Sequence, residues 1–397
     1  MSWIITSDQV SPPGDAAITY GITNAGGVFN LRSTGTVGYE VEWGDGNVEI
    51  STLNTLPHTY TAGDYSVVVY SDGVYRPYFN NTTADVTQIT SVAIGSGADL
   101  GTNLDRAWFG ANNMTSFVCP FDVTSSVTNF GIAWNNCTSL TSFPELNTSS
   151  GTNFSNTWRN CISLTSFPLI DTSNGTSFNA AWSECSSLIS FPLLNTSNVT
   201  NFAYAWRGCT SLTSFSELNT SSGTDFSNAW AGCTSLTSFP LLNTSSGTNY
   251  GFAWQNCTSL TSFPLLDTSS GTNFGSTWRG CSSLTSFPEL NTSSGTTFGN
   301  AWENCSSLTD FPANMFDTTG TLIAIAFNRA WLNCALTAQS IENILVSLDT
   351  NGATGITLGI DGGTNADTST WSAAANAAWL SLDAKGWNIN QNGPDPT

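Results

Sequence analysis

Apolar residues recur through the middle of the chain with a period of 24 residues. In each unit a cysteine follows the tryptophan after three residues, a leucine follows after three more, and a phenylalanine after a further three. The tryptophans stand at Trp134, Trp158, Trp182, Trp206, Trp230, Trp254, Trp278 and Trp302. Less regular copies around Trp108 and Trp331 flank this array. So constant a period predicts a quasi-one-dimensional stack in which each unit buries its apolar face against its neighbours.

One unit divides into three parts. Phe154, Trp158 and Cys161 stand at i, i+4 and i+7, the spacing of one face of a short helix. The segment Ser-Leu-Thr-Ser-Phe-Pro is rich in β-favouring residues and ends at proline, which predicts a short strand. Asn147, or Asn or Asp at the equivalent positions, then predicts an Asx-turn.

The predicted fold is α+β, a leucine-rich-repeat-like solenoid of about ten 24-residue coils with a β module before it and an α/β cap after it. We expect the N-terminal β-sandwich-like module at residues 1–99, the repeats at 100–336 and the cap at 337–397. For the cap the pattern predicts an amphipathic helix beginning near residues 336–342, a Gly/Thr-rich stretch that contains 356–360, a helix near 370–385 and a final segment at 386–389.

The repeat resembles the BspA-like leucine-rich repeats of bacterial surface proteins. The family core A-[FW]-x-x-C-x-x-L-x-x-[FIL]-P is matched by residues 133–144 and their successors, over about residues 100 to 336. Upstream, Trp43-Gly44-Asp45-Gly46 with His58-Thr59-Tyr60 resembles a polycystic-kidney-disease-type β-sandwich module. The resemblance implies an adhesin or a virion surface protein, and we favour a phage-type virion protein. This implication is an analogy at the level of fold.

The chain has 397 residues and a formal net charge of −20, with only 9% charged residues. Such a surface repels nucleic acid and anionic lipid, since binding either requires a cationic patch. The segment Met1–Asp8 lacks the features of a signal peptide, and no run of 18 apolar residues predicts a membrane span. The expected location is therefore the virion surface, reached without a signal peptide.

The repeat supplies most of the ten cysteines. No C-x-x-C pair is present, so zinc-type spacing is missing and buried thiols are favoured over metal or disulfide roles. Cys119 is out of register, and we expect it to be the most exposed cysteine. The predicted structural ladder comprises Trp158, Cys161, Trp182, Cys185, Trp206, Cys209, Trp230 and Cys233.

Catalytic and metal chemistry finds little support in the sequence, and no cofactor is expected. His58 is the only histidine, and a structural role is favoured over catalysis. Asp45 lies in a predicted hairpin turn whose glycines have positive φ, and calcium there, or along the Asn/Asp positions of the repeat, stays an alternative. Glu145, Glu217 and Glu289 recur every third unit, too far apart for a glycosidase pair, so the chain is expected not to be an enzyme.

The candidate binding surface is the series of hydroxyl pairs on the predicted strands. Regular hydroxyl rows bind sugars or ice, although they also serve as a solvated face that discourages aggregation. The residues are Thr141, Ser142, Thr165, Ser166, Thr213, Ser214, Thr237 and Ser238.

The predicted function is non-enzymatic, a phage fibre, spike or decoration protein that contributes to host attachment. The expected partners are a host cell-surface glycan or protein and other virion proteins, and a homo-oligomer is compatible with the sequence. Nucleic acid and membrane insertion are not expected. The alternatives are a cellular adhesin of the BspA-like type, a polysaccharide depolymerase and, more remotely, an ice-binding protein.

Overall fold

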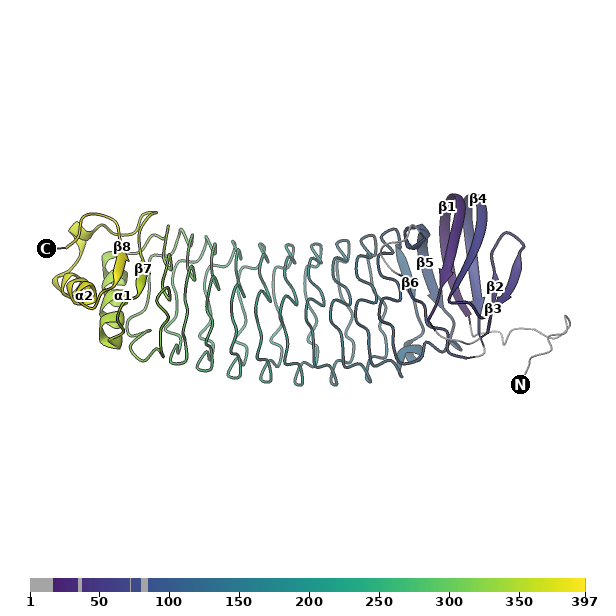
Figure 1. Ribbon diagram of the computed structural model, residues 1–397, viewed down its shortest axis with the longest axis horizontal. Coiled ribbons are helices and arrows are strands. Elements are labelled where there is room, and N and C mark those ends of the chain that lie inside the picture. The colour runs from purple at the N-terminus through teal and green to yellow at the C-terminus, as the bar shows by residue number, and fades with distance from the viewer. Residues whose placement is uncertain (1–16, 35–37, 72, 80–84, 397) are drawn as a thin grey trace. The chain divides into compact units, whose positions relative to one another are not determined.

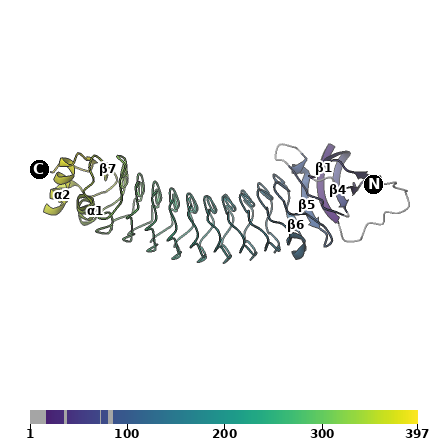
Figure 2. The ribbon, with the colours of Figure 1, turned by 60° about the horizontal axis from the view of Figure 1, so that its bottom comes forward.

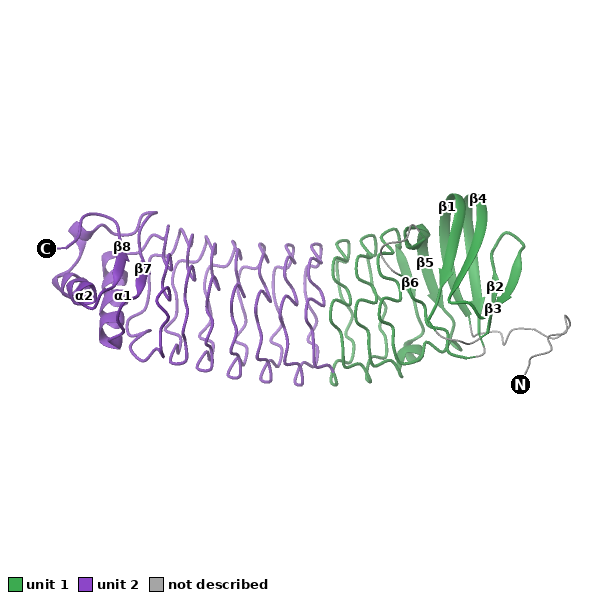
Figure 3. Cartoon of the chain, in the orientation of Figure 1, with its two compact units in different colours: residues 1–174 green, residues 175–397 purple. Residues whose placement is uncertain are grey.

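The computed structural model describes residues 17–34, 38–71, 73–79 and 85–396. The chain divides into two compact units, Met1–Asn174 (unit 1) and Gly175–Thr397 (unit 2), coloured separately in Figure 3. The fold is mixed α+β, with two α-helices in the described part and a sheet-rich N-terminal part. The expected absence of a signal peptide concerns Met1–Asp8, which lie outside the described residues. The predicted domain boundaries after residues 99 and 336 stay a prediction.

Unit 1 begins with one six-stranded sheet of order β3-β2-β4-β1-β5-β6 (Figure 1). Neighbouring strands are antiparallel except for β5 and β6, which are parallel. Short 3-10 helices η1 (Val86–Gln88) and η2 (Phe121–Thr124) lie before β5 and after β6. The strands are β1 (Ala17–Arg32), β2 (Tyr39–Glu42), β3 (Val48–Ser51), β4 (Thr55–Tyr70), β5 (Ile89–Ile94) and β6 (Ser116–Val118).

The two longest strands, β1 and β4, form the centre of this sheet. Ile18, Tyr20 and Ile22 alternate along β1 and are all buried, as the period of two in a strand requires. The Tyr20 ring packs edge to face on Phe79, which covers it from a loop. A sandwich needs two facing sheets, whereas the described strands of this region form a single sheet, so the sandwich-like arrangement is not seen in them.

The predicted helix in the repeat is wrong, because the segment from Phe154 to Cys161 forms consecutive turns. The N–H of Cys161 donates to the carbonyl of Trp158, three residues earlier, at 3.2 Å. Asn156 and Asn160 have φ of 56° and 62°, and a left-handed residue does not continue a right-handed helix. The two turns still bury the side chains of Phe154, Trp158 and Cys161, which is why the spacing resembles that of a helix.

Every second residue of this turn segment pairs with the next repeat. In unit 2 the four N–H groups of one segment donate to carbonyls of the following repeat at 2.8 to 2.9 Å. The parallel main-chain pairing therefore lies in the turn segment. The donor and acceptor pairs are Phe202 with Asp225, Tyr204 with Ser227, Trp206 with Ala229, and Gly208 with Ala231.

The predicted strand in Ser-Leu-Thr-Ser-Phe-Pro is also wrong, because these segments do not pair into a β-ladder from repeat to repeat. The segment is extended but bonds sparsely to its neighbour, for example from the N–H of Thr261 to the carbonyl of Thr237 at 3.3 Å. Proline at its end has no N–H to donate, so a ladder cannot continue through it. The copy that ends in Ser216 forms no strand either, so proline is not the whole reason. Only the flanking copy, which has Val118 instead of proline, forms a strand there, β6.

The repeat builds a ladder of stacked aromatic rings in each unit. In unit 2, successive tryptophan rings from Trp182 to Trp331 lie 5.0 to 6.1 Å apart and nearly parallel. Unit 1 contains the same stacking, with 5.9 Å and 1° between Trp134 and Trp158. Phenylalanines pack edge to face on these rings, as Phe215 does on Trp206. Figure 2 shows the successive repeats of unit 2 lying side by side.

Unit 2 ends in the two α-helices that the sequence predicts, together with a 3-10 helix and two short strands that it does not. They are α1 (Ala338–Asn351), β7 (Thr357–Gly359), the 3-10 helix η3 (Thr368–Thr370), α2 (Ala373–Ala384) and β8 (Asn388–Asn390), with β7 and β8 parallel. Thr337 caps α1 by accepting a hydrogen bond from the Ser340 N–H. The Trp331 N–H donates to the carbonyl of Gly359 at 2.9 Å, so this segment pairs directly with the last repeat.

No helix in the described ranges is long and apolar enough to cross a membrane.

We expect Trp206→Ala to lower the free energy of unfolding by about 3–5 kcal/mol, the range for a large buried side chain. Trp206 is fully buried and stacks on rings of both neighbouring repeats. Trp206→Phe should cost less, because phenylalanine refills part of the cavity and removes an indole N–H that has no acceptor among the described residues. Chemical denaturation of both variants measures this, with Thr213→Ser as an exposed control, and an unchanged midpoint for Trp206→Ala would contradict it.

Candidate functional site

The hydroxyl pairs predicted to bind all lie on the surface. Thr141, Ser142, Thr165 and Ser166 are exposed in unit 1, and Thr213, Ser214, Thr237 and Ser238 are exposed in unit 2. Each pair is flanked by a buried leucine and a buried phenylalanine that hold the extended segment against the core. We call the unit 2 surface made by Thr213, Ser214, Thr237, Ser238, Thr261 and Ser262 the hydroxyl face.

The two hydroxyls of a pair have different hydrogen bonds. Thr213 donates its hydroxyl to the carbonyl of Ile189 at 3.4 Å, and Thr261 donates to the carbonyl of Thr237 at 3.4 Å. The hydroxyls of Ser214 and Ser238 have no partner among the residues that the structure describes. Thr213 and Thr261 therefore connect neighbouring repeats through their hydroxyls. The Thr237 hydroxyl has no partner among the described residues, so Thr237 and the serines are the groups that can bind a ligand.

A column of exposed leucines lies three residues beyond these serines. Leu193, Leu241 and Leu265 are 59 to 62% exposed, and Glu217 occupies the same position in the repeat between Leu193 and Leu241. Sequence reasoning identified this position but did not predict its exposure. The signal was available, since a position that accepts both leucine and glutamate is one that faces solvent.

The recurring glutamates do not form a catalytic pair. Glu217 and Glu289 are exposed and stand three repeats apart in unit 2, where neighbouring tryptophan rings are at least 5.0 Å apart. Their separation is therefore well above the ~5–10 Å that glycosidase carboxylates require.

The ladder residues point into the core. Trp158, Cys161, Trp182, Cys185, Trp206, Cys209, Trp230 and Cys233 are all fully buried. The cysteine thiol donates to the carbonyl of the tryptophan one repeat earlier, for example Cys233 to Trp206 at 3.3 Å. Cys119, expected to be the most exposed, is buried as well, although its 7% exposure is the largest among the ten cysteines.

We expect the ladder thiols to be unreactive in the native protein and to make it alkali-sensitive. Burial raises the pKa of the Cys233 and Cys281 thiols to about 12. Unfolded thiols ionise near pH 9, so their contribution to the free energy of unfolding is full below that pH and decreases as pH rises toward 12. Iodoacetamide labelling with and without denaturant, together with denaturation curves from pH 7 to 11, measures both effects. Rapid native labelling of most thiols, or equal stability at pH 7 and 11, would refute this prediction.

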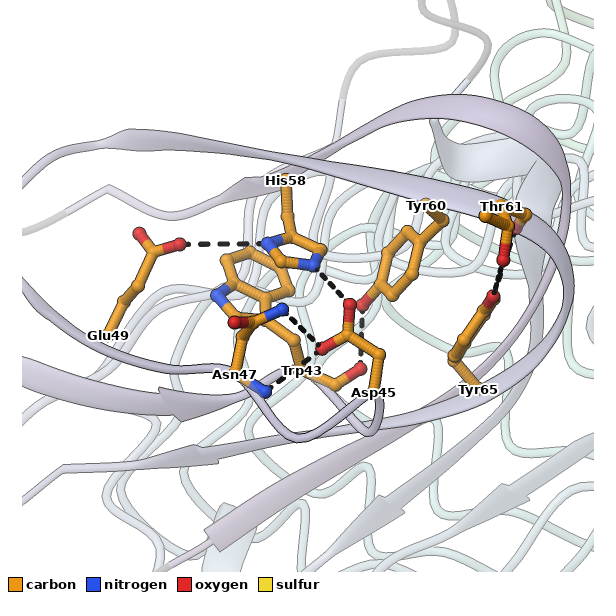
Figure 4. Close-up of polar contacts among 8 residues, drawn as sticks. All are labelled: Trp43, Asp45, Asn47, Glu49, His58, Tyr60, Thr61 and Tyr65. Carbon is orange, nitrogen blue, oxygen red and sulfur yellow. Dashed lines mark hydrogen bonds and ion pairs between the residues drawn. The ribbon is translucent and has the colours of Figure 1, made fainter.

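His58 connects two parts of the N-terminal sheet (Figure 4). Its ring stacks on Trp43 at 4.5 Å, and its Nε2 lies 2.8 Å from Oδ2 of Asp45. Its Nδ1 lies 3.6 Å from Oε1 of Glu49. The histidine on β4 is thereby joined to the β2–β3 hairpin, and Tyr60 adds a hydrogen bond from its hydroxyl to the Trp43 carbonyl at 2.8 Å.

The hairpin turn has the predicted geometry. Gly44 and Gly46 have φ of 82° and 95°. Both oxygens of Asp45 accept hydrogen bonds from protein groups, Oδ1 from Asn47 and Oδ2 from His58. Within the described part of the chain, no group of three or more His, Cys, Asp or Glu could hold a metal ion. The turn asparagines are similarly engaged, since Oδ1 of Asn219 accepts from the Ser221 N–H at 3.2 Å.

No family model matches the chain, and no curated protein is similar to it.

The assignment of a site therefore depends on the geometry of the chain itself. The hydroxyl face presents free polar groups at a regular spacing. The His58 cluster has its groups engaged with one another and serves the sheet.

We expect acid to loosen the β2–β3 hairpin first. The hydrogen bond from His58 holds the pKa of Asp45 below its usual value near 3.8. This carboxylate therefore stabilises the hairpin above about pH 4, and the stabilisation is lost as pH falls through the lowered pKa. Amide hydrogen exchange of residues 43–51 at pH 6 and pH 3 measures this. The Asp45→Asn variant should lose most of the difference, and a difference that persists in it would assign the effect to another group.

Proposed function

We propose that this chain is a leucine-rich-repeat-like solenoid of about ten 24-residue coils, with an N-terminal β module and a C-terminal α/β cap. Its function is non-enzymatic attachment at a virion surface, as a phage fibre, spike or decoration protein. The proposed partners are a host cell-surface glycan or protein, with other virion proteins as neighbours in the particle.

The observation that carries the binding part of this proposal is the free serine row of the hydroxyl face. The ladder tryptophans, their phenylalanine partners, the thiols and leucines such as Leu212 and Leu236 are committed to the core. On the hydroxyl face, repeats offer a ligand serine hydroxyls without an internal partner, as at Ser214 and Ser238, at a fixed repeat distance. Many weak and equally spaced contacts suit a repetitive ligand, because they add through multivalency.

A depolymerase is the weaker alternative. The recurring glutamates are three repeats apart, and the single histidine is engaged with Asp45 and stacked on Trp43. The virion setting rests on the resemblance of the repeat to bacterial and phage surface proteins. A cellular adhesin would use the same surface in the same way.

We expect the triple variant Ser214→Ala, Ser238→Ala, Ser262→Ala to bind host cells and their purified glycans at least about tenfold more weakly. Removal of exposed hydroxyls should change the free energy of unfolding by less than about 0.5 kcal/mol. Pull-down on intact cells and interferometry on immobilised glycans measure the binding, and both are repeated with and without Ca²⁺.

The matched control changes Ser211, Ser235 and Ser259 to alanine, since these serines lie in the same repeats but are only partly exposed. This control should bind normally. Equal binding by the test variant and the native protein would exclude the hydroxyl face, and release of oligosaccharides from any of the glycans would overturn the non-enzymatic proposal. Mass spectrometry of purified particles from the source culture tests the virion setting.

A further inference from the structure

The turn segments of unit 2 form a second exposed surface, different in chemistry from the hydroxyl face. We call it the turn face, and it consists of residues 179–184, 203–208, 227–232, 251–256, 275–280, 299–304 and 328–333. These segments are joined by the main-chain hydrogen bonds that link each repeat to the next. The register of their side chains along the surface is therefore fixed.

Two aromatic side chains stand on this face in an unfavourable backbone conformation. Tyr204 and Phe252 have φ of 59° and 62°, and both are 41% exposed. Asn228 and Asn300 occupy the same position in other repeats, and asparagine tolerates left-handed backbone far better than a bulky residue does. Neither ring has a ring partner in the described residues. The position is left-handed in every repeat of unit 2, where Ala180, Ser276 and Arg329 also occupy it, so the conformation belongs to the fold. The fold does not require an aromatic side chain there, and an exposed ring without a partner is available to a ligand.

The two aromatic residues are in register two repeats apart. The N–H of Tyr204 donates to the carbonyl of Ser227, and the N–H of Asn228 donates to that of Gly251, directly before Phe252. The ring spacing is 5.5 Å from Trp206 to Trp230 and 5.3 Å from Trp230 to Trp254, so the two positions are about 11 Å apart. An extended sugar chain offers an apolar ring face at a comparable interval, every second residue.

The turn face also gathers positive charge. It holds Arg207, Arg279 and Arg329, three of only eight Lys and Arg residues in a chain of net charge −20. Arg279 and Arg329 share the buried carboxylate of Glu303, at 2.8 and 2.5 Å. Their side chains remain 40% and 54% exposed, and each guanidinium has five N–H donors, so some stay available to a ligand.

Arg207 lies in the same turn segment as Tyr204, three residues after it. It pairs with Glu184 at 2.7 Å and is 45% exposed. Both glutamates of the face are thus already paired, and Asp225 adjoins the face, since its Oδ1 accepts from the Ser227 N–H at 2.9 Å. The face is therefore close to neutral, and what it offers an anion is the guanidinium N–H groups that the glutamates leave unfilled. Charges more than ~10 Å away are screened at 0.1 M salt, so the negative total of the chain does not prevent these local contacts.

We propose that the turn face of unit 2 binds an acidic polysaccharide chain of the polyuronate type. Tyr204 and Phe252 pack against the apolar faces of alternate sugar rings, and Arg207, Arg279 and Arg329 receive the carboxylates. Guanidinium binds carboxylate through paired hydrogen bonds, which a neutral sugar cannot match. This inference deepens the proposed function and rests on it only in taking attachment to glycans as the role of the chain.

Polygalacturonate and alginate serve as acidic probes, and fully methyl-esterified polygalacturonate serves as a neutral probe with the same sugar rings. We expect at least about tenfold tighter binding to the acidic chains than to the ester, and weaker binding at high salt. Titration calorimetry of the full chain measures both effects.

Two double variants test the face. Each replaces residues of the turn face with the residue that another repeat has at the same position. Tyr204→Asn with Phe252→Asn copies Asn228, and Arg207→Gln with Arg279→Gln copies Gln255, while Arg329 stays to pair with Glu303. Each should weaken polyuronate binding at least about tenfold. The asparagine variant should melt at the same or a higher temperature, because asparagine relieves the left-handed strain. Ile189→Thr, which removes a 53% exposed apolar side chain from the other surface, should bind normally.

Equal binding of acid and ester, normal binding by the asparagine variant, or no binding of any polyuronate would each overturn the inference. If polyuronates fail while cell binding depends on Ser214, Ser238 and Ser262, the proposed function stands and this inference is wrong. If the turn-face variants lose cell binding although polyuronates never bind, the face binds another partner, and the assignment to a polyuronate is wrong.

Discussion

The stacking of each tryptophan on the next is the interaction on which the rest of the structure depends. Within either unit the rings lie nearly parallel at 5 to 6 Å, close to the spacing of paired backbone segments. The same repeat distance therefore satisfies the rings and the main-chain hydrogen bonds of the turn segment. Phenylalanine packs on the ring edges, and the thiol of the next repeat donates to the tryptophan carbonyl. Side chains that would compete with this register are excluded from the ring stack, and the buried polar side chains, such as Thr220 and Thr244, donate hydrogen bonds to the next repeat.

How the backbone achieves this burial could be predicted only in part. The period identifies Trp158 and Cys161 as core residues. An apolar position that is the same in successive repeats is expected to pack against its equivalent in the next repeat. The local conformation was harder to predict, because the spacing from Phe154 to Cys161 fits a helix and also fits two turns that bury the same side chains. Asn156 and Asn160 were the available signal, as asparagine is the side chain that best tolerates left-handed backbone. The C-terminal helices were easier to predict, because α1 has a capping Thr337 and a terminal Gly352 that mark its limits.

The candidate surfaces differ in how far the sequence reveals them. The exposure of Ser214 and Ser238 follows from their places between buried residues, and their freedom from internal hydrogen bonds required coordinates. The turn face was not predicted, because the helical interpretation assigned the segment around each tryptophan to the core. The period of 24 residues already places Tyr204 and Phe252 in one column, two repeats apart. Their exposure, and that of Arg279, required coordinates.

The stacking of each repeat on its two neighbours affects how the gene can change. Each repeat of the ladder contacts the repeat before it and the repeat after it, and the repeats are nearly interchangeable. Recombination between such similar coding segments can therefore delete or duplicate a whole repeat, and the two new neighbours would still present matching rings and hydrogen-bonding groups. Loss of the repeat around Trp230 would bring Tyr204 and Phe252 into adjacent positions, and duplication of that repeat would separate them further. The ligand preference of such a surface could change in discrete steps without any new amino acid, which gives a lineage a rapid way to follow a changing target.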